Sequence, residues 1–124
     1  MMEVESAFSG FREKHQALVI LPSPMVYAYS ARFAELALKH RLPAISMPRN
    51  FAKMGGTVTY GPDLGELNKR AVDLAAKILA GAKPSDLPIE TPTKFDFLIN
   101  THTARKLGLK VPDRFLVGAE LVSK

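Results

Sequence analysis

Two short stretches of this sequence carry side chains suited to holding a small ligand. The first is Ser23 with Pro24, directly after the apolar run of residues 17–21, and the second is Tyr60 with Gly61, at the end of a β-branched run. A tyrosine offers a planar solute a flat face and a hydroxyl, a serine adds a second hydroxyl, and a glycine lets the backbone approach closely. These residue types predict non-covalent binding of a small solute.

Each stretch also has a purely structural interpretation. The prolines around Ser23 favour a rigid turn, in which the serine hydroxyl would cap the local backbone. Tyr60 would belong to a hinge strand and pack against a neighbouring helix, since glycines such as Gly61 are common where a strand leads into a helix. The N–H groups at the start of that following helix are a further place for a carboxylate. The residues alone leave both interpretations open.

Residues suited to catalysis or metal binding do not cluster along the sequence. His15, His40 and His102 lie far apart and no pair has zinc-ligand spacing. The chain has no cysteine, which excludes disulfides, thiolate metal sites and cysteine nucleophiles. There is no phosphate-binding loop and no dinucleotide fingerprint. We therefore predict a protein that is not an enzyme, with no catalytic residue, no metal and no cofactor.

Length and composition limit the class of protein. With 124 residues, 47% of them hydrophobic and 23% charged, the chain is one domain's worth of soluble protein and too short for two complete lobes. No apolar run approaches the roughly 20 residues of a membrane helix, so no membrane insertion is expected. The net charge of +5 is dispersed, without a basic block that interleaves aromatics, so no nucleic-acid partner is expected.

The elements that must position the candidate residues alternate between strand and helix. Apolar and β-branched runs predict four main strands, of parallel type, at residues 17–21, 44–47, 57–60 and 94–99. Helical spacing predicts helices at residues 3–14, from Tyr29 to about residue 41, at residues 63–80 and at residues 101–107, with a single turn at residues 50–54. This alternation predicts an α/β fold, a mostly parallel sheet with flanking helices. The 17–21 strand is expected to be covered on both faces.

The helix at residues 63–80 has the clearest boundaries. Asp63 and Glu66 form an acidic variant of the capping box at its start. Gly81 suits the position just after its end, and Glu66 lies one turn before Arg70, where an ion pair is favourable. Because open α/β sheets bind ligands beyond the carboxyl ends of their strands, the loops after residues 21 and 60 are the places to expect a site.

Residues 57–100, together with ALVILPSP at 17–24 and HRLPAI at 40–45, resemble the C-terminal portion of a known family. It comprises the ABC transporter substrate-binding proteins of the tryptophan/tyrosine-transport type. The resemblance implies a partial two-lobed, periplasmic-binding-protein-like type I fold that closes over a small amino-acid-like or aromatic solute. It also implies an ABC permease as partner and a periplasmic location. Relatives often carry aspartate where Ser23 stands, which argues against a charge-based contact to a ligand amine here.

The resemblance assigns residues 1–60 to the second lobe, residues 61–93 to a hinge crossing with a first-lobe helix and connector, and residues 94–124 to the return strand and C-terminal helices. Such a fragment supplies at most one wall of a solute site, so by itself it should bind no amino-acid-like solute tightly. It should also expose apolar surface and tend to self-associate.

Other functions remain open at this stage. The first residues are acidic and lack the charged and apolar pattern of a signal peptide, so a chain expressed from Met1 would be cytoplasmic. The alternative to a receptor fragment is therefore a truncated intracellular remnant or a stand-alone α/β module without transport activity. A small flavodoxin-like enzyme or phosphate binder is a third class, for which the sequence offers no glycine-rich loop.

Overall fold

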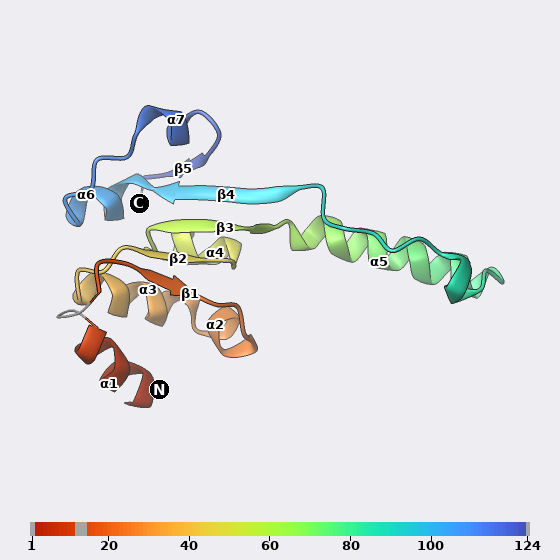
Figure 1. The fold of residues 1–124 in the computed structure, drawn as a ribbon, viewed down its shortest axis with the longest axis horizontal. Helices are drawn as coiled ribbons and strands as arrows, with labels where there is room; N and C mark the ends of the chain where they lie inside the picture. The colour runs from red at the N-terminus through yellow and green to blue at the C-terminus, as the bar shows by residue number, and fades with distance from the viewer. Residues whose placement is uncertain (1, 12–14, 124) are drawn as a thin grey trace. The chain divides into compact units, whose positions relative to one another are not determined.

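The computed structural model describes residues 2–11 and 15–123. Its contacts divide the chain into two compact units: unit 1 is Met1–Gly61 with Phe97–Lys124, and unit 2 is Pro62–Asp96. The elements follow one another as α1 (Met2–Phe11), β1 (Leu18–Ile20), α2 (Pro24–Ala28), α3 (Ser30–Lys39), β2 (Ala44–Ser46), α4 (Arg49–Lys53), β3 (Val58–Pro62), α5 (Leu64–Leu79), η1 (Pro84–Asp86), β4 (Phe95–Asn100), α6 (Thr101–Lys106), α7 (Asp113–Leu116) and β5 (Glu120–Val122) (Figure 1). No helix among the described residues is long and apolar enough to cross a bilayer.

The strands form one five-stranded sheet in the order β1-β2-β3-β4-β5. β1, β2 and β3 are parallel to one another, and β4 is parallel to β5. β4 runs antiparallel to β3, because the Asn100 N–H donates to the Thr57 carbonyl (3.0 Å) while the Phe97 ring contacts Tyr60 further along (Figure 1). The predicted α/β fold with a mostly parallel sheet is thus confirmed. The expectation that all four main strands are parallel is wrong for β4.

Helices α1 to α4 bury one face of this sheet. Alternate strand residues point to the same side, so Leu18 and Ile20 of β1 and Ala44 of β2 face these helices. The core on this side is an apolar cluster drawn from all four helices and β2: Phe8, Val26, Phe33, Ala34, Leu36, Ala37, Ala44 and Phe51. Burial of these side chains is the main stabilising term for unit 1.

The short helix α4 is held in place by polar side chains from three other elements. The Thr59 hydroxyl of β3 donates to the Pro48 carbonyl (3.1 Å) and accepts from the Ala52 N–H (3.1 Å). Asn100 Nδ2 donates to the Ala52 carbonyl (2.8 Å), and the Thr103 hydroxyl donates to the Gly55 carbonyl (2.9 Å). A five-residue helix is too short to be stable alone. We call these contacts the α4 clasp.

The loop after β1 differs from the prediction. Pro24 is the first residue of α2, and the Ser23 hydroxyl caps that helix by accepting the Val26 N–H (3.2 Å). Proline suits the first helical position because its missing N–H would have had no helical partner. The expected helix from Tyr29 therefore begins one residue later as α3, behind the separate short helix α2.

The end of the chain contains a strand that the sequence analysis did not identify. Residues 120–122 pair with β4 as β5, where the sequence analysis predicted no strand. The Glu120 carboxylate pairs with Arg49, and with Lys53 Nζ at 3.7 Å. The Thr101 hydroxyl donates to the Val122 carbonyl (3.2 Å). Three residues carry too little pattern to be distinguished from a tail.

The second face of the sheet is largely uncovered. Val19, in the middle of β1, is 74% exposed, and Leu21 is exposed as well. The prediction that the 17–21 strand is covered on both faces is therefore wrong within this chain. A continuous apolar run indicates that a strand suits burial on both sides, but it does not tell whether the same chain supplies the second layer.

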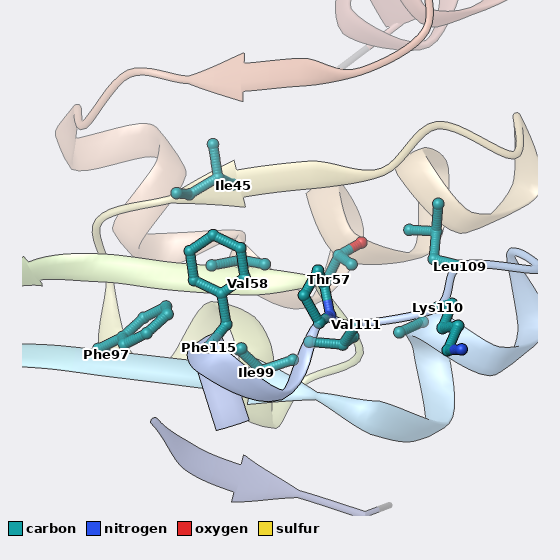
Figure 2. Close-up of a pocket in the computed structure, with 11 residues that line it drawn as sticks. Ile45, Thr57, Val58, Phe97, Ile99, Leu109, Lys110, Val111 and Phe115 are labelled. Carbon is teal, nitrogen blue, oxygen red and sulfur yellow. The ribbon is translucent and has the colours of Figure 1, made fainter. Parts of the chain in front are cut away.

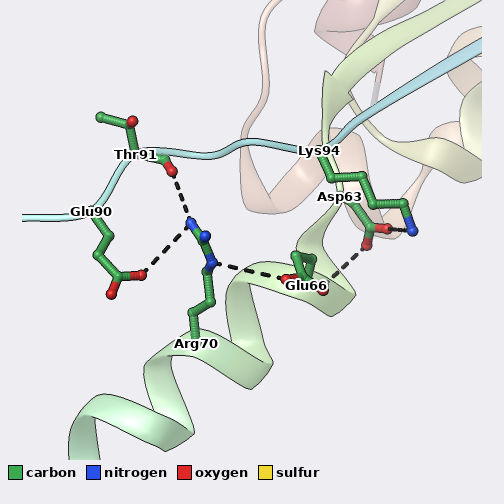
Figure 3. A network of polar contacts seen from close by, with 6 residues as sticks. All are labelled: Asp63, Glu66, Arg70, Glu90, Thr91 and Lys94. Carbon is green, nitrogen blue, oxygen red and sulfur yellow. Dashed lines mark hydrogen bonds and ion pairs between the residues drawn. The ribbon is translucent and has the colours of Figure 1, made fainter.

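Unit 2 consists of α5 and the extended segment that returns beside it. Asp63 caps α5 by accepting the Glu66 N–H (3.1 Å), and Gly81 follows its end with a φ of +105°, so both predicted boundary signals are confirmed. Arg70 joins the helix to the return segment (Figure 3). It forms an ion pair with Glu66 in the helix (3.8 Å) and with Glu90 in the return segment (3.6 Å), and it donates a hydrogen bond to the Thr91 carbonyl (3.0 Å). No residue of α5 is fully buried.

The two ends of unit 2 are fastened together at Asp63 and Lys94. The Asp63 N–H donates to the Lys94 carbonyl (3.0 Å), and Lys94 Nζ lies 3.0 Å from Asp63 Oδ2 (Figure 3). The Lys94 ammonium, followed by the Glu66 N–H, lowers the pKa of Asp63 below its ordinary 3.8. Stability that comes from a depressed carboxyl pKa is complete above the unfolded value and disappears as pH falls toward the folded one.

We therefore expect the fastening of unit 2 to loosen only below about pH 3.8. The amide proton of Glu66 reports the cap, so its NMR shift should titrate with a midpoint below 3.8. In Lys94→Ala the largest cause of the shift is gone, and the midpoint should move up toward 3.8. Lys69→Ala removes a cation from the same helix and should leave the midpoint unchanged. A parent midpoint at or above 3.8 would contradict the ion pair.

Candidate functional site

The carboxyl ends of the three parallel strands surround a small hollow. Its volume is about 200 Å³. It is lined by residues of β1, β2 and β3 and of the segments that follow them: Val19, Ile20, Leu21, Pro22, Ile45, Ser46, Met47 and Tyr60. None of these side chains carries a carboxylate or an amine. The hollow can therefore hold a ligand through ring, apolar and hydroxyl contacts, but it supplies no formal charge.

Tyr60 is the most exposed aromatic group at this hollow. Its side chain is 54% exposed in the middle of β3, which continues to Pro62 instead of ending at residue 60 as predicted. The ring meets the ring of Phe97 on β4 edge-on, with centroids 5.9 Å apart and planes at 80°. Tyr60 thus packs edge-on against a residue of the neighbouring strand. A tyrosine ring that is 54% exposed has area left to stack against a planar solute.

Gly61 follows Tyr60 and is buried. A Cβ at this position would overlap Met47 Cγ and lie 3.0 Å from the Met47 carbonyl oxygen. The close backbone approach that the glycine was predicted to allow is therefore made by Met47 of the adjacent strand end. Gly61 allows β3 to lie close to the segment after β2, and so helps to position Met47 and Tyr60, two residues that line the hollow.

Ser23 and Pro24 lie next to the hollow but do not line it. Their neighbour Pro22 does. The Ser23 oxygen is occupied as the cap of α2, which is the role that the structural interpretation gave it. Among the four residues predicted for the site, the structure brings Tyr60 to the hollow and sets Gly61 behind it. Contact of any of the four with a solute stays a prediction.

Met47 was missed by the sequence analysis. It directly follows β2, while Pro22 comes two residues after β1 and Tyr60 lies two residues before the end of β3. The rule that ligands bind beyond the carboxyl ends of parallel strands applies equally to all three strands, so it could have identified Met47. The methionine was interpreted only as a packing residue, because its flexible thioether fills gaps in most folded proteins.

The α4 clasp fixes the geometry of this hollow. Pro48, which follows Met47, accepts the Thr59 hydroxyl, and Thr59 precedes Tyr60. This hydrogen bond therefore joins Pro48, the neighbour of Met47, to Thr59, the neighbour of Tyr60. Thr59 is completely buried. Within residues 2–11 and 15–123, no group of three or more histidine, cysteine, aspartate or glutamate side chains is placed to hold a metal ion.

Comparison with known proteins identifies the family of this chain. The sequence pattern described as "ABC transporter substrate binding protein" matches residues 1–123. The chain belongs to the ABC transporter substrate-binding protein family. The resemblance stated from the sequence is thus confirmed. The family is one of substrate-binding proteins, and the expectation that the chain is not an enzyme stays a prediction.

Relatives of known identity or structure include a "Tyrosine-binding protein" from Clostridioides difficile. It is 23% identical over 108 residues, which make up 87% of this chain and 31% of that protein. A "conserved domain protein" from Vibrio cholerae matches with a TM-score of 0.86 and 23% identity, over 98% of this chain and 41% of the other. An "ABC domain in complex with L-Trp" from Streptococcus pneumonia matches with a TM-score of 0.83 and 20% identity, over 98% and 42%.

The chain spans less than half the length of these relatives. The two solved structures share the fold of this chain over 98% of its residues. The family assignment follows from the sequence match.

Proposed function

We propose that this chain forms one wall of the solute site in the receptor of an ABC importer, and that the solute is a small amino-acid-like or aromatic molecule. The observation that carries the proposal is the Tyr60 ring. It stands half exposed over a hollow at the carboxyl ends of three parallel strands. The names of two relatives support an aromatic amino acid, since one binds tyrosine and one holds L-Trp.

In this proposal the parts of the chain take the roles that the family resemblance implies. Residues 1–60 belong to the second lobe, residues 61–93 cross the hinge and add a first-lobe helix, and residues 94–124 return and complete the second lobe. The complete receptor would close its lobes over the solute by hinge motion. It would work outside the cytoplasmic membrane and deliver the solute to an ABC permease.

The absence of charge at the hollow has a consequence for specificity. An amino acid carries an ammonium and a carboxylate, and neither finds a partner among the residues that line the hollow. We infer that this wall recognises the side chain of the solute, and that the charged groups are bound by the wall that the rest of the receptor supplies.

Replacement of Tyr60 by alanine tests the proposal. A complete site can be made by substituting residues 1–123 for the matched segment of the Streptococcus protein, whose fold they share. In that receptor Tyr60→Ala should weaken binding of L-Trp or L-Tyr by about 1–3 kcal/mol, or roughly 5- to 150-fold, because a stacked ring is lost. Isothermal titration calorimetry measures the change.

Two further variants serve as controls. Tyr29→Ala removes another half-exposed tyrosine that does not line the hollow, so its affinity should equal that of the parent. Tyr60→Phe keeps the ring and should retain most of the affinity. Unchanged binding in Tyr60→Ala would remove Tyr60 from the site. The 124-residue chain alone, titrated in ¹H–¹⁵N NMR spectra, should show shifts near Tyr60 and Gly61 only at millimolar solute.

A further inference from the structure

Among the residues that line the hollow beside Tyr60, Met47 has the most adjustable side chain. We propose that Met47 determines which aromatic ring the hollow accepts, a single ring or a fused pair. This inference rests on the proposed function, in which an aromatic solute stacks on Tyr60. It adds a residue that selects among such solutes, whereas Tyr60 would hold all of them.

Most of the other residues that line the hollow are restrained. Pro22 has a fixed ring, and the Tyr60 ring contacts Phe97 edge-on. The strand residues of the hollow are β-branched and therefore stiff at χ1: Val19, Ile20 and Ile45. Met47, by contrast, is unbranched, with three rotatable bonds and a polarizable thioether. It is thus the side chain by which the size of the hollow is set.

The backbone on both sides of Met47 is fixed. Ser46 is buried and pairs with Ile20 of β1 and Thr59 of β3. The Ser46 hydroxyl also donates to the Ile20 carbonyl (3.0 Å). On the other side, the Pro48 carbonyl accepts the Thr59 hydroxyl (3.1 Å) as part of the α4 clasp. Substitution of Met47 should therefore change the size of the hollow without moving the segments around it.

The Met47 side chain lies against the backbone of Gly61, the residue after Tyr60. A Cβ on Gly61 would overlap Met47 Cγ, so the first part of the methionine side chain is held beside β3. The sulfur and the terminal methyl group can still rotate beyond that contact. Because Met47 and Tyr60 line the same hollow, we expect a ring stacked on Tyr60 to meet these atoms at its edge, where a thioether contacts an aromatic ring favourably.

Size is the main property by which this hollow can distinguish one ring from another. Its volume is about 200 Å³, and no side chain that lines it is charged. Leu21 at the hollow is exposed, so the hollow is open to solvent on one side and discrimination should be moderate. A difference of one methylene in an apolar pocket changes affinity by about 10- to 200-fold, and we expect the lower end of that range here.

Unit 1 contains a larger hollow that offers an aromatic solute another place. It measures about 350 Å³ and lies between the strands and the segment with α7, where Phe115 stands over the sheet (Figure 2). It shares Ile45 with the hollow beside Tyr60 but includes neither Met47 nor Tyr60. Binding there would depend on Phe115 and would not respond to position 47, so substitutions distinguish the two hollows.

Isothermal titration calorimetry of the receptor described above, which combines residues 1–123 with the rest of the Streptococcus protein, tests the inference. The probes are L-Trp and L-Phe, because they differ in ring size and neither carries a ring hydroxyl. L-Phe is measured in competition with L-Trp. In Met47→Ala the ratio of the two affinities should shift toward L-Trp by about tenfold, and in Met47→Phe toward L-Phe by about tenfold. A merely structural defect would weaken both solutes alike.

Three variants serve as controls, and circular dichroism verifies the fold of each. Met47→Leu nearly conserves volume, so its ratio should stay within about threefold of the parent's. Met54→Ala and Met54→Phe alter an exposed methionine directly after α4 that does not line the hollow, so the ratio should not change.

The outcomes separate this inference from the proposed function. Ratios that stay unchanged in Met47→Ala and Met47→Phe, or that shift in the same direction, would overturn the role of Met47, while weaker binding in Tyr60→Ala would still support the proposed function. If Phe115→Ala weakens binding and Tyr60→Ala does not, the solute lies in the larger hollow, and both proposals are wrong.

A second measurement uses the 124-residue chain itself. With ¹³C-labelled methionine methyl groups, the ring current of a bound solute shifts the methyl signals that it contacts. Millimolar L-Trp should move the Met47 signal, identified by its loss in Met47→Leu, and should leave those of Met25 and Met54 in place. An unmoved Met47 signal beside a shifted Tyr60 amide would overturn this inference alone. No shift at either residue would contradict the proposed function as well.

Discussion

Asn100→Ala is expected to lower the free energy of unfolding of unit 1 by about 2–4 kcal/mol. The Asn100 side chain is completely buried. Its Nδ2 donates to the Ala52 carbonyl (2.8 Å), and its Oδ1 accepts the Thr103 N–H (2.9 Å). Alanine would leave the buried Thr103 N–H without its acceptor and would take the amide donor from the Ala52 carbonyl, which keeps the Gly55 N–H (3.2 Å). A buried group left without a partner costs about 1–3 kcal/mol. Urea denaturation followed by circular dichroism measures the change.

The matched control is Asn68→Ala, an exposed asparagine on α5, for which we expect a change within about 0.5 kcal/mol. Asn100→Asp gives a second comparison. It keeps an acceptor for Thr103 but turns the donor that faces the Ala52 carbonyl into an oxygen, so it should cost at least as much as alanine. A loss below about 1 kcal/mol in Asn100→Ala would show that the α4 clasp does not stabilise unit 1.

Gly56→Ala should also be strongly destabilising, by about 1–3 kcal/mol. The new Cβ would overlap the ring of Phe51 and lie 2.7 Å from its Cζ. Phe51 is completely buried in the core cluster, so the ring has no space into which to move. The preceding Gly55 differs, because nothing lies within 4 Å of its Cβ position but its φ is +103°. An alanine there is opposed by backbone strain instead of by contact.

A double-mutant cycle separates these causes. In a Phe51→Leu background the ring is gone, so Gly56→Ala should cost clearly less than in the parent, whereas Gly55→Ala should cost the same in both. Gly118→Ala, at a position with open space and no positive φ, should change stability by less than about 0.5 kcal/mol. Equal costs for Gly56→Ala in both backgrounds would contradict the steric explanation.

The sequence predicts best those elements whose signals are local. Helix α5 begins and ends where Asp63 and Gly81 indicate, because a cap and a left-handed residue act on the adjacent backbone alone. Strands were predicted at residues 44–47 and 94–99 and occur at Ala44–Ser46 and Phe95–Asn100. A short run of apolar, β-branched residues favours an extended segment that packs in a sheet, which is what both runs form.

The direction of β4 could not be predicted in this way. The sequence of an apolar strand is the same whether its neighbour in the sheet is parallel or antiparallel, so the direction is not encoded locally. Its direction is decided by the pairing of Thr57 with Asn100 and of Tyr60 with Phe97, which are contacts between residues distant in the chain. The exposure of Val19 was missed for a related reason, since whether a second layer covers a strand depends on segments far from it.

For the candidate site, the rule of strand ends identified Tyr60 but not its surroundings. The role of Gly61 depends on Met47, and the role of Ser23 depends on the helix start at Pro24. Neither partner is visible from spacing along the chain. The assignment of residues 1–60, 61–93 and 94–124 to lobes and hinge likewise stays a prediction, because it concerns a receptor of which this chain forms one part.

The fastening between Asp63 and Lys94 influences how the sheet can assemble. Strands β3 and β4 are neighbours in the sheet, although residues 63–94, nearly all of unit 2, lie between them in sequence. Pairing them directly would require closure of a long loop, and each doubling of loop length adds about 0.6 kcal/mol of entropy cost. Once the Asp63 N–H has bonded to the Lys94 carbonyl, the long loop is already closed. Tyr60 and Phe97 then lie only three residues from the two bonded residues.

Unit 2 thus acts like the turn of a very large hairpin, from which β3 and β4 can pair residue by residue toward Thr57 and Asn100. We expect Asn100 to reach Ala52 at the end of that pairing. The α4 clasp, and with it the positions of Met47 and Tyr60, should then form late in the folding of unit 1.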